Sequence, residues 1–247
     1  MEKNSISVII LSLNEAGNIR NVVNLVLKSL REENFSDFEL ILVDSGSNDG
    51  TEKIIEELAA TYTFTKAVHD LPRGGLGRSF KTGLALASKD YVGWFPGDNE
   101  TLPETMTNIF KEIGNFNIII PFTVNTLVRS LYRRILSVTY TTFFNIVFGL
   151  HLEYFNGPCF FRRQLLNDVT MSTDGPAYMA EILVQLVKKN VSYVEVPMYI
   201  KPRDYGKASV LKWKNVYLIA ETIIRLFFRM YFSRNQKPNR RGGFYVS

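Results

Sequence analysis

The stretch from Lys89 to Glu100 reads KDYVGWFPGDNE, and it indicates the class of fold. Its Tyr, Val, Trp and Phe residues favour a pleated, buried backbone, so we expect a strand from Tyr91 to Phe95. Pro96 and Gly97 end this strand, and the acidic turn 98–100 follows. In an open α/β sheet ligands bind at the carboxyl ends of the strands, where this turn is expected to lie. The alternative interpretation is a polar turn that only caps the next helix.

Strands and helices alternate on both sides of this stretch. A near-continuous apolar run predicts a strand at 6–11. Further strands are predicted at 38–43, 116–120 and 191–196, with a weaker one at 62–68 and a short strand entered from the turn at 156–161. Amphipathic or apolar patterns predict helices at 19–30, 51–58, 78–87, from 103, and at 135–150, 177–189 and 213–232. This order predicts an α/β fold with a mostly parallel sheet, flanked by helices and linked by right-handed crossovers.

The composition suits one large domain. The chain has 247 residues, of which 46% are hydrophobic and 21% charged. We expect one domain over 1–210, followed by an amphipathic helix and basic tail over 211–247. The single cysteine, Cys159, has no partner for a disulfide and fits a reducing compartment. No signal peptide is recognised, and no stretch reaches the roughly 20 apolar residues that span a bilayer. A cytoplasmic protein is therefore expected.

Positive charge is concentrated at the C-terminal end. The chain carries a net charge of +5, but residues from 201 onward carry eleven Lys or Arg and two Asp or Glu. The helix predicted at 213–232 has one charged stripe, Glu221, Arg225 and Arg229, on an otherwise apolar surface. With the uncharged 135–150 segment, this pattern favours attachment to the cytoplasmic face of a membrane without spanning it. A homo-oligomer contact is the alternative, and no motif supports nucleic acid as a partner.

Several polar residues follow predicted strands and are candidates for binding. Glu15 comes after the first strand, Asp44 ends the second, and a glycine-rich turn occupies 73–78. Each also has a structural interpretation, as a helix-start carboxylate, a capping group or an ordinary turn. Asp98 and Glu100 are two apart on a tight turn, so their carboxylates could converge on one hard cation that holds a diphosphate.

Together, these segments resemble glycosyltransferase family 2, which has the GT-A fold. The resemblance covers nearly the whole chain and rests on ISVIILSLNEAGNI (6–19), LVDSGSNDGT (42–51), RGGLGRSFKTGLALA (73–87) and FPGDNE (95–100). Within the family the sequence is most similar to dolichol-phosphate mannose synthases and bacterial polyprenyl-phosphate glycosyltransferases. That likeness rests on LYRR (131–134), FNGPCFF (155–161) and VEVP (194–197), followed by Arg203, Gly206 and Ser209.

The resemblance implies an inverting hexosyltransferase that moves a sugar from a GDP- or UDP-sugar to a polyprenyl or dolichyl phosphate. It implies Mg²⁺ or Mn²⁺ on Asp98 and Glu100, and catalytic roles for Asp98, Arg133 and Arg203. The nucleotide-sugar contacts that it implies are Leu11, Leu13, Glu15, Asp44, Gly77 and Asp98. The acceptor phosphate contacts that it implies are Arg133, Ser137, Arg203 and Lys207.

The sequence departs from the family pattern at three places. Pro96 replaces the first Asp of the Asp-x-Asp metal motif, Ser45 replaces the second Asp of an Asp pair, and no Arg follows the fifth strand near Phe122. Two alternatives therefore stay open. The first is a transferase that extends a saccharide or glycolipid, which would need a base, with Asp174 or Glu181 as candidates. The second is a non-catalytic subunit that binds a nucleotide-sugar.

Overall fold

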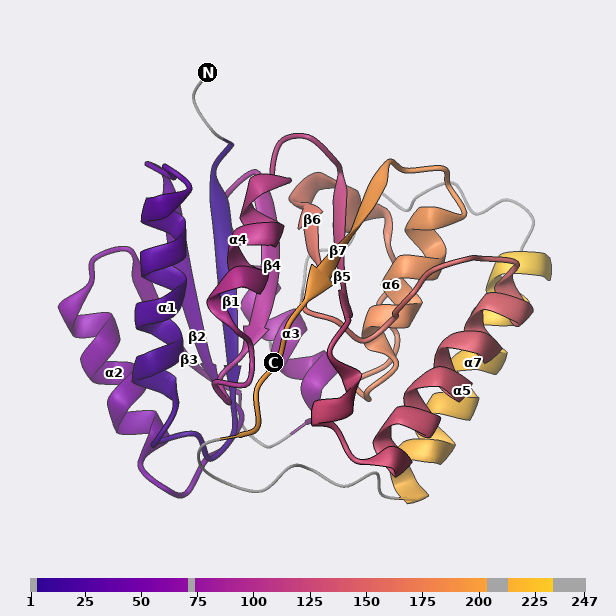
Figure 1. Ribbon diagram of the computed structural model, residues 1–247, viewed down its shortest axis with the longest axis horizontal. Coiled ribbons are helices and arrows are strands. Elements are labelled where there is room, and N and C mark those ends of the chain that lie inside the picture. Colours follow the sequence, from indigo (N-terminus) through magenta and orange to yellow (C-terminus); the bar gives the residue numbers. More distant parts are fainter. Residues whose placement is uncertain (1–3, 71–73, 204–212, 233–247) are drawn as a thin grey trace.

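The computed structural model describes residues 4–70, 74–203 and 213–232, and it confirms the α/β fold (Figure 1). The strands are β1 (Ile6–Ser12), β2 (Phe38–Asp44), β3 (Thr65–His69), β4 (Tyr91–Pro96), β5 (Ile118–Thr123), β6 (Phe160–Arg162) and β7 (Tyr193–Met198). The α-helices are α1 (Ile19–Glu32), α2 (Thr51–Thr61), α3 (Leu76–Leu86), α4 (Pro103–Lys111), α5 (Leu131–Phe148), α6 (Tyr178–Val187) and α7 (Trp213–Phe232). Two short 3₁₀ helices are η1 (Thr126–Val128) and η2 (Arg163–Asp168).

The strands form one sheet in the order β3-β2-β1-β4-β6-β5-β7. Neighbours pair in parallel except at β6, which is antiparallel to both β4 and β5. All the other strands therefore run in one direction, and their carboxyl ends share one edge of the sheet. The prediction of a mostly parallel sheet is confirmed.

Gly93 allows the reversed strand β6 to fit against β4. It lies opposite Phe160 in the β4–β6 pair. A Cβ atom at position 93 would come within 2.2 Å of the Phe160 ring. Because a buried ring cannot move by that amount in a packed core, this position requires glycine.

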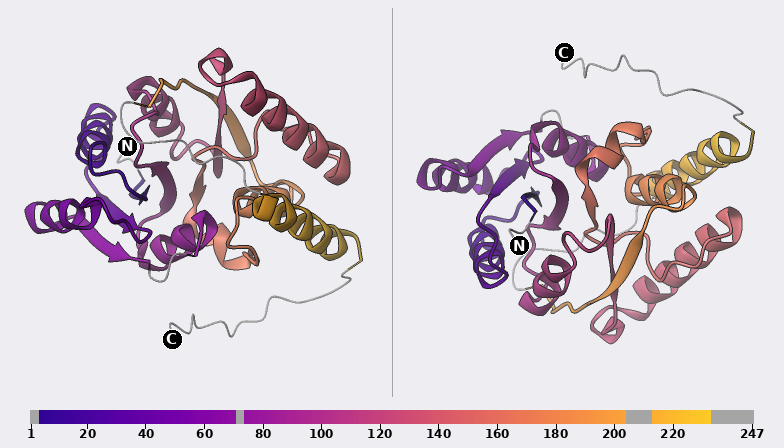
Figure 2. Two further views of the ribbon diagram at one scale, coloured as in Figure 1. Left: turned by 90° about the horizontal axis from the view of Figure 1, so that it is seen from below. Right: turned by 90° about the horizontal axis from the view of Figure 1, so that it is seen from above.

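Helices cover both faces of the sheet (Figure 2). On one face β1, β2 and β4 pack against α1, α2 and α4, and buried residues such as Val23, Leu58 and Phe110 fill the layer between them. On the other face α3, α5, α6 and α7 contribute to a second apolar layer that includes Phe80, Phe144 and Leu226. Strands β1, β2 and β4 are therefore buried on both faces, as a near-continuous apolar sequence predicts, whereas the edge strands β3 and β7 are only partly buried.

Some element boundaries differ from the predictions. The third strand begins at Thr65 rather than at 62, because the amide of Tyr62 still donates to the carbonyl of Leu58 at the end of α2. Helix α5 begins at Leu131 rather than at 135. Ser130 caps it by accepting from the amide of Arg133, and Gly149 ends it in the left-handed conformation, at φ 59°. Arg133 and Arg134 therefore lie in its first turn.

Helices α5 and α7 lie at the same end of the molecule in both figures (Figures 1 and 2). The hydroxyl of Tyr231 on α7 donates to the carbonyl of Val147 on α5 at 3.1 Å. Leu226 is fully buried and anchors α7 to the main core. Within the described residues no helix is long and apolar enough to cross a membrane.

Candidate active site

Charged side chains from four different connections meet at the carboxyl edge of the sheet. Glu15 follows β1, Asp98 and Glu100 follow β4, Arg129 follows η1 beyond β5, and Arg203 follows β7. Because these strands are parallel, segments that are distant in sequence leave the sheet at the same place. The chain therefore gathers three carboxylates and two guanidinium groups at one edge.

Arg203 is the centre of this group. Its guanidinium donates to Asp98 Oδ2 at 2.7 Å, to Glu100 Oε1 at 3.1 Å and to Glu15 Oε1 at 3.2 Å. Its side chain is 20% exposed, and the three carboxylate side chains are 7–15% exposed. Burial raises the pKa of the Glu15 carboxyl, while a hydrogen bond from Asn18 and the charge of Arg203 oppose that rise.

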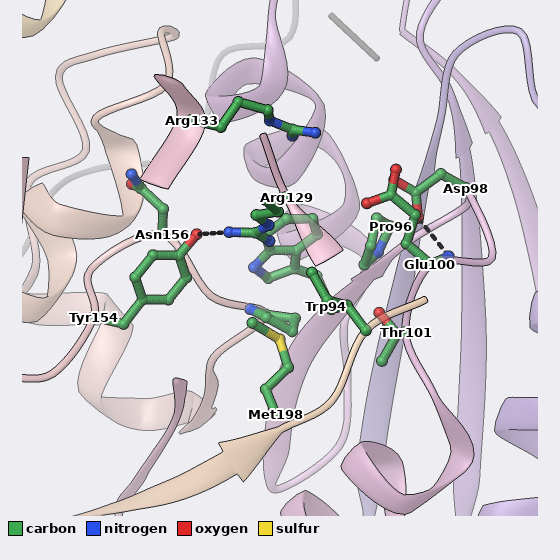
Figure 3. A pocket seen from close by; sticks show the side chains of 12 residues that line it. Trp94, Pro96, Asp98, Glu100, Thr101, Arg129, Arg133, Tyr154, Asn156 and Met198 are labelled. Carbon is green, nitrogen blue, oxygen red and sulfur yellow. Dashed lines mark hydrogen bonds between the residues drawn. The ribbon is translucent and has the colours of Figure 1, made fainter. Parts of the chain in front are cut away.

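The acidic turn has a conformation that its sequence supports. Asn99 adopts a left-handed backbone at φ 58°, which asparagine tolerates better than most residues. The amide of Glu100 donates to Asp98 Oδ1 at 3.1 Å, which fixes that carboxylate against the turn (Figure 3). Asp98 and Glu100 are thereby held on one side of the turn, both within reach of Arg203.

These carboxylates offer the oxygen ligands that Mg²⁺ and Mn²⁺ prefer. Among the described residues, no three His, Cys, Asp or Glu side chains are grouped closely enough to hold a metal ion by themselves. Mg²⁺ commonly uses one or two carboxylates and takes its remaining ligands from substrate phosphates and water. Asp98 and Glu100 therefore fit a cation that is shared with a bound diphosphate.

A pocket of about 220 Å³ opens beside the acidic turn (Figure 3). Asp98 and Glu100 line one side of it, and Arg129 and Arg133 line another (Figure 3). Its remaining lining residues are Trp94, Pro96, Thr101, Tyr154, Asn156, Pro158, Met198 and Ile200. It thus combines negative and positive groups with both polar and apolar side chains.

Two buried N–H donors in the pocket wall have no protein acceptor in the described part of the chain. They are Nε1 of Trp94 and Nε of Arg129. Nη1 of Arg129 donates to the hydroxyl of Tyr154 at 3.2 Å, as the dashed line in Figure 3 shows. A buried donor without an acceptor is costly, so this wall suits a ligand that carries oxygen atoms.

The residues expected to contact the nucleotide-sugar have different surroundings. Leu11 is buried at the end of β1, and Leu13 is half-buried just beyond it. The carboxylate of Asp44 accepts from the amide of Ser47 at 3.2 and 3.3 Å, which is the capping arrangement considered as an alternative. The turns that carry Glu15 and Asp44 are joined, since the amide of Glu15 donates to the hydroxyl of Thr51 at 2.8 Å.

Gly77 has a packing role in this structure. Its amide donates to the carbonyl of Asp174 at 3.0 Å. A Cβ at this position would come within 2.9 Å of the carbonyl oxygen of Thr173. The glycine therefore lets the start of α3 approach the 173–174 loop, and its amide is engaged in the protein itself.

Neither candidate base lines the pocket. Glu181 is 1% exposed and accepts from the amide and hydroxyl of Ser172, the amide of Thr173 and the guanidinium of Arg229. Asp174 is about half exposed and forms an ion pair with Lys81. Glu181 therefore supports the fold, and the geometry gives neither carboxylate a place beside the pocket.

The residues expected to hold an acceptor phosphate are only partly brought together. Arg133 lines the pocket, whereas Ser137, one turn further along α5, does not. Arg203 is engaged by three carboxylates, and Lys207, Gly206 and Ser209 lie outside the described residues. Sequence reasoning missed Arg129, Tyr154 and Trp94. The pairing of Arg129 with Tyr154 joins residues 25 positions apart, which periodicity does not reveal.

Comparison with known sequences gives a clear family match. The pattern described as glycosyl transferase family 2 matches residues 7–170. The cholesterol galactosyltransferase of Borreliella burgdorferi is 32% identical over 109 residues, which are 44% of this chain and 29% of that protein. An uncharacterised protein of Methanocaldococcus jannaschii is 24% identical over 216 residues, which are 82% of this chain and 93% of that protein. The chain thus matches under a third of the galactosyltransferase.

Solved structures share the fold. The glucosyl-3-phosphoglycerate synthase of Mycobacterium tuberculosis, in complex with Mn²⁺, uridine diphosphate and phosphoglyceric acid, superposes with a TM-score of 0.63. It is 19% identical, and the match covers 91% of this chain and 78% of that one. A second crystal structure of that enzyme contains Mg²⁺ and uridine diphosphate. It superposes with a TM-score of 0.62 and is 19% identical, and the match covers 91% of this chain and 78% of that one.

Proposed function

The chain belongs to glycosyl transferase family 2, and from this premise we propose that it transfers a sugar from a nucleotide-sugar to an anionic lipid acceptor, a polyprenyl phosphate. The observation that carries the proposal is the division of the pocket into two charged sides. Asp98 and Glu100 line one side of the pocket and Arg129 and Arg133 line the other, and the pocket has a volume of about 220 Å³. A diphosphate that shares a cation with the carboxylates and an acceptor phosphate on the arginines would meet there.

The donor side of the pocket has the groups that a nucleoside diphosphate needs. Asp98 and Glu100 would hold Mg²⁺ or Mn²⁺, which would neutralise the leaving diphosphate. Glu15 and Asp44, at the ends of the adjacent strands β1 and β2, would face the nucleoside. The relatives support a divalent cation and a uridine nucleotide, since the Mycobacterium tuberculosis enzyme was crystallised with both.

The acceptor side of the pocket includes Arg133, which belongs to a helix with exposed apolar residues. Arg133 is in the first turn of α5, and large apolar residues on the same helix are exposed: Leu131 66%, Tyr132 59%, Ile135 56%, Val138 65%, Phe143 47% and Ile146 75%. Helix α7 adds Tyr217, Ile224, Phe228 and Phe232, each more than half exposed. An amphiphile with a phosphate head suits this arrangement, because the head would reach Arg133 while the tail lies along α5.

The chemistry would depend on positioning and charge. An acceptor phosphate is ionised near neutral pH, so its oxygen needs no general base. Of the described residues that line the pocket, the carboxylates are Asp98 and Glu100, both on the donor side. Arg129 and Arg133 would orient the acceptor, and the side chains of Trp94 and Met198 in the pocket lining would limit access of water to the donor sugar.

A second candidate function is transfer to a saccharide or another small acceptor. The Borreliella burgdorferi relative is a cholesterol galactosyltransferase, and the Mycobacterium tuberculosis structure contains phosphoglyceric acid. Phosphoglyceric acid is also an anion, so an arginine-lined pocket would serve either class of acceptor. A sugar hydroxyl requires a base, and the carboxylates in the described lining of the pocket are Asp98 and Glu100, which are proposed to hold the metal ion.

Attachment to the cytoplasmic face of a membrane is part of the proposal. The exposed apolar surface of α5 and α7 and the +9 net charge of residues 201–247 support it. The test offers GDP- and UDP-sugars in turn, with Mn²⁺ or Mg²⁺, to the full chain with polyprenyl phosphate in vesicles. We expect a lipid-linked sugar from one donor. Transfer only to saccharides, cholesterol or phosphoglycerate would overturn the lipid-phosphate assignment.

A further inference from the structure

The guanidinium of Arg203 contacts the two carboxylates, Asp98 and Glu100, that would bind a metal ion. Its three nitrogen atoms each contact a different carboxylate, from Glu15, Asp98 and Glu100, at 2.7–3.2 Å. Two of these carboxylates are the proposed metal ligands, and they also line the pocket. We propose that Arg203 is an internal counter-ion that competes with the divalent cation for Asp98 and Glu100 and is released when the cation and nucleotide bind. This inference rests on the proposed function.

Charge explains why both cations do not share these ligands. Glu15, Asp98 and Glu100 are mostly buried, so without a positive partner they would repel one another in a region that water screens poorly. Arg203 supplies that partner. A second cation bound to the same oxygen atoms would be close to a guanidinium that cannot lose its proton, so the guanidinium must leave.

The exchange links the two sides of the pocket. While Arg203 contacts Asp98 and Glu100, its donors are directed to the donor side and are unavailable to an acceptor anion. Once it is released, its charge adds to that of Arg129 and Arg133, which line the same pocket as Asp98 and Glu100. Binding of the donor complex would therefore prepare the site for the acceptor, and the preferred order is donor first.

The variant Arg203→Gln tests the competition by direct metal binding. Titration of the full chain with Mn²⁺, followed by the electron paramagnetic resonance signal of free Mn²⁺, measures affinity without any turnover. We expect Arg203→Gln to bind Mn²⁺ at least tenfold more tightly than the wild type in the absence of nucleotide. Without Mn²⁺ the melting temperature of Arg203→Gln should be lower than that of the wild type. Addition of Mn²⁺ should raise the melting temperature of the variant by more than that of the wild type. Arg20→Gln, which removes an exposed arginine paired with Glu57, should match the wild type in both respects.

Chemical labelling of the wild type is a second test that needs no folded variant. Phenylglyoxal modifies accessible guanidinium groups, and mass spectrometry reports the extent at Arg203. We expect saturating Mn²⁺ to increase labelling of Arg203 severalfold while labelling of Arg20 stays constant. Unchanged labelling at Arg203 would overturn the proposal, as would Mn²⁺ affinity in Arg203→Gln no higher than in the wild type.

The outcomes separate this inference from the proposed function. If the wild type binds Mn²⁺ with UDP or GDP but neither test detects competition, the function stands and the inference fails. If the wild type binds no Mn²⁺ with any nucleotide while Arg203→Gln binds it, competition is supported and the enzyme function is contradicted. If neither protein binds Mn²⁺, both are overturned.

Discussion

Arg229 on α7 donates a hydrogen bond to Oε1 of Glu181 on α6 at 3.0 Å. The same carboxylate accepts from Ser172 and Thr173, so one buried acidic group joins α6, the 172–173 loop and the last described helix. The expected boundary near residue 210 between a catalytic domain and a separate C-terminal segment falls outside the described residues. Helix α7 itself packs on the main core.

The first prediction concerns this contact. Glu181→Gln removes the charge that pairs with Arg229 and leaves the loop amides with weaker acceptors, so we expect a loss of roughly 1–3 kcal/mol in the free energy of unfolding. Urea denaturation measures the loss. Activity per folded molecule should stay within about twofold of the wild type. A stable Glu181→Gln protein with no activity would instead identify Glu181 as a base.

The second prediction concerns the acidic turn. Asp98→Asn keeps the shape of the side chain but weakens its hold on a divalent cation, so metal-dependent binding of UDP or GDP should be lost. Turnover should fall by at least about 100-fold, since even the partners of metal ligands contribute 10- to 100-fold. Calorimetry and product formation measure the two effects. Glu104→Gln, an exposed change in the first turn of α4, is the matched control and should behave as the wild type. Normal turnover of Asp98→Asn would contradict the assignment.

How much of this site follows from the sequence depends on whether strand order alone brings residues together. Glu15, Asp98 and Glu100 each follow a parallel strand of the sheet. The alternation of strands and helices along the sequence is therefore enough to predict that these residues share one edge of the sheet. The sequence resemblance implied a role for Arg203 in catalysis and in binding the acceptor phosphate. Its contacts with the three carboxylates were not predicted, because these partners lie 103 to 188 positions away. The apolar period of α6 likewise predicts its buried face but does not reveal that the 172–173 loop returns to cover Glu181.

Arg129 illustrates the same limit. In the sequence it is one of three arginines before an apolar helix, and nothing local distinguishes it from Arg134. Only the path from β5 through η1 places it opposite Tyr154 and beside the acidic turn. The resemblance to lipid-phosphate transferases implied an arginine close after the fifth strand. Arg129 lies six positions beyond the end of β5 and faces the pocket.

The third prediction concerns pH. Glu39 is buried, and burial alone would raise its pKa, but hydrogen bonds from Lys66, Ser88 and Ser7 outweigh that effect and lower the pKa to about 2. A carboxyl with a lowered pKa in the folded state contributes stability above its ordinary pKa of about 4.5, and that contribution is lost as pH falls toward 2. The contribution near neutrality is roughly 3 kcal/mol.

Glu39→Gln therefore should be less stable than the wild type at pH 7. The difference should shrink between about pH 4.5 and 2, the interval over which the wild-type carboxylate takes up its proton. Chemical denaturation at a series of pH values measures both curves. A constant difference across that interval would show that the hydrogen bonds of Glu39, and not its charge, supply the stability.

The fourth prediction concerns the exposed face of α5. Ile135 and Ile146 are 56% and 75% exposed, and transfer of such a side chain from water into lipid contributes roughly 1.5–3 kcal/mol when burial is complete. Ile135→Glu or Ile146→Glu in the full chain should therefore weaken binding to anionic vesicles by at least tenfold. Leu86→Glu, a matched change at a 40% exposed position of α3, should have little effect in a flotation assay. Loss of a dimer without loss of vesicle binding would assign this face to self-association.

The fifth prediction concerns the acceptor. Arg129 and Arg133 line the pocket and would bind the acceptor phosphate, whereas the neighbouring Arg134 does not line it. Arg129→Gln and Arg133→Gln should each raise the KM for polyprenyl phosphate at least tenfold, because a hydrogen bond to a charged group contributes about 1.5–3 kcal/mol. Calorimetric binding of the nucleotide with Mn²⁺ should stay unchanged.

Arg134→Gln is the control that isolates the pocket. It removes the same charge from the same turn of α5, so any general effect on attraction to the membrane is equal in Arg133→Gln and Arg134→Gln. Of these two variants, only Arg133→Gln should change the KM for a short, water-soluble prenyl phosphate that is assayed without vesicles. Asp174→Asn should leave both the KM for the acceptor phosphate and the binding of the nucleotide with Mn²⁺ unaltered, because an ionised phosphate needs no base. If Asp174→Asn is inactive while both pocket variants work normally, the acceptor is a sugar hydroxyl, and a base outside the described pocket lining performs the reaction.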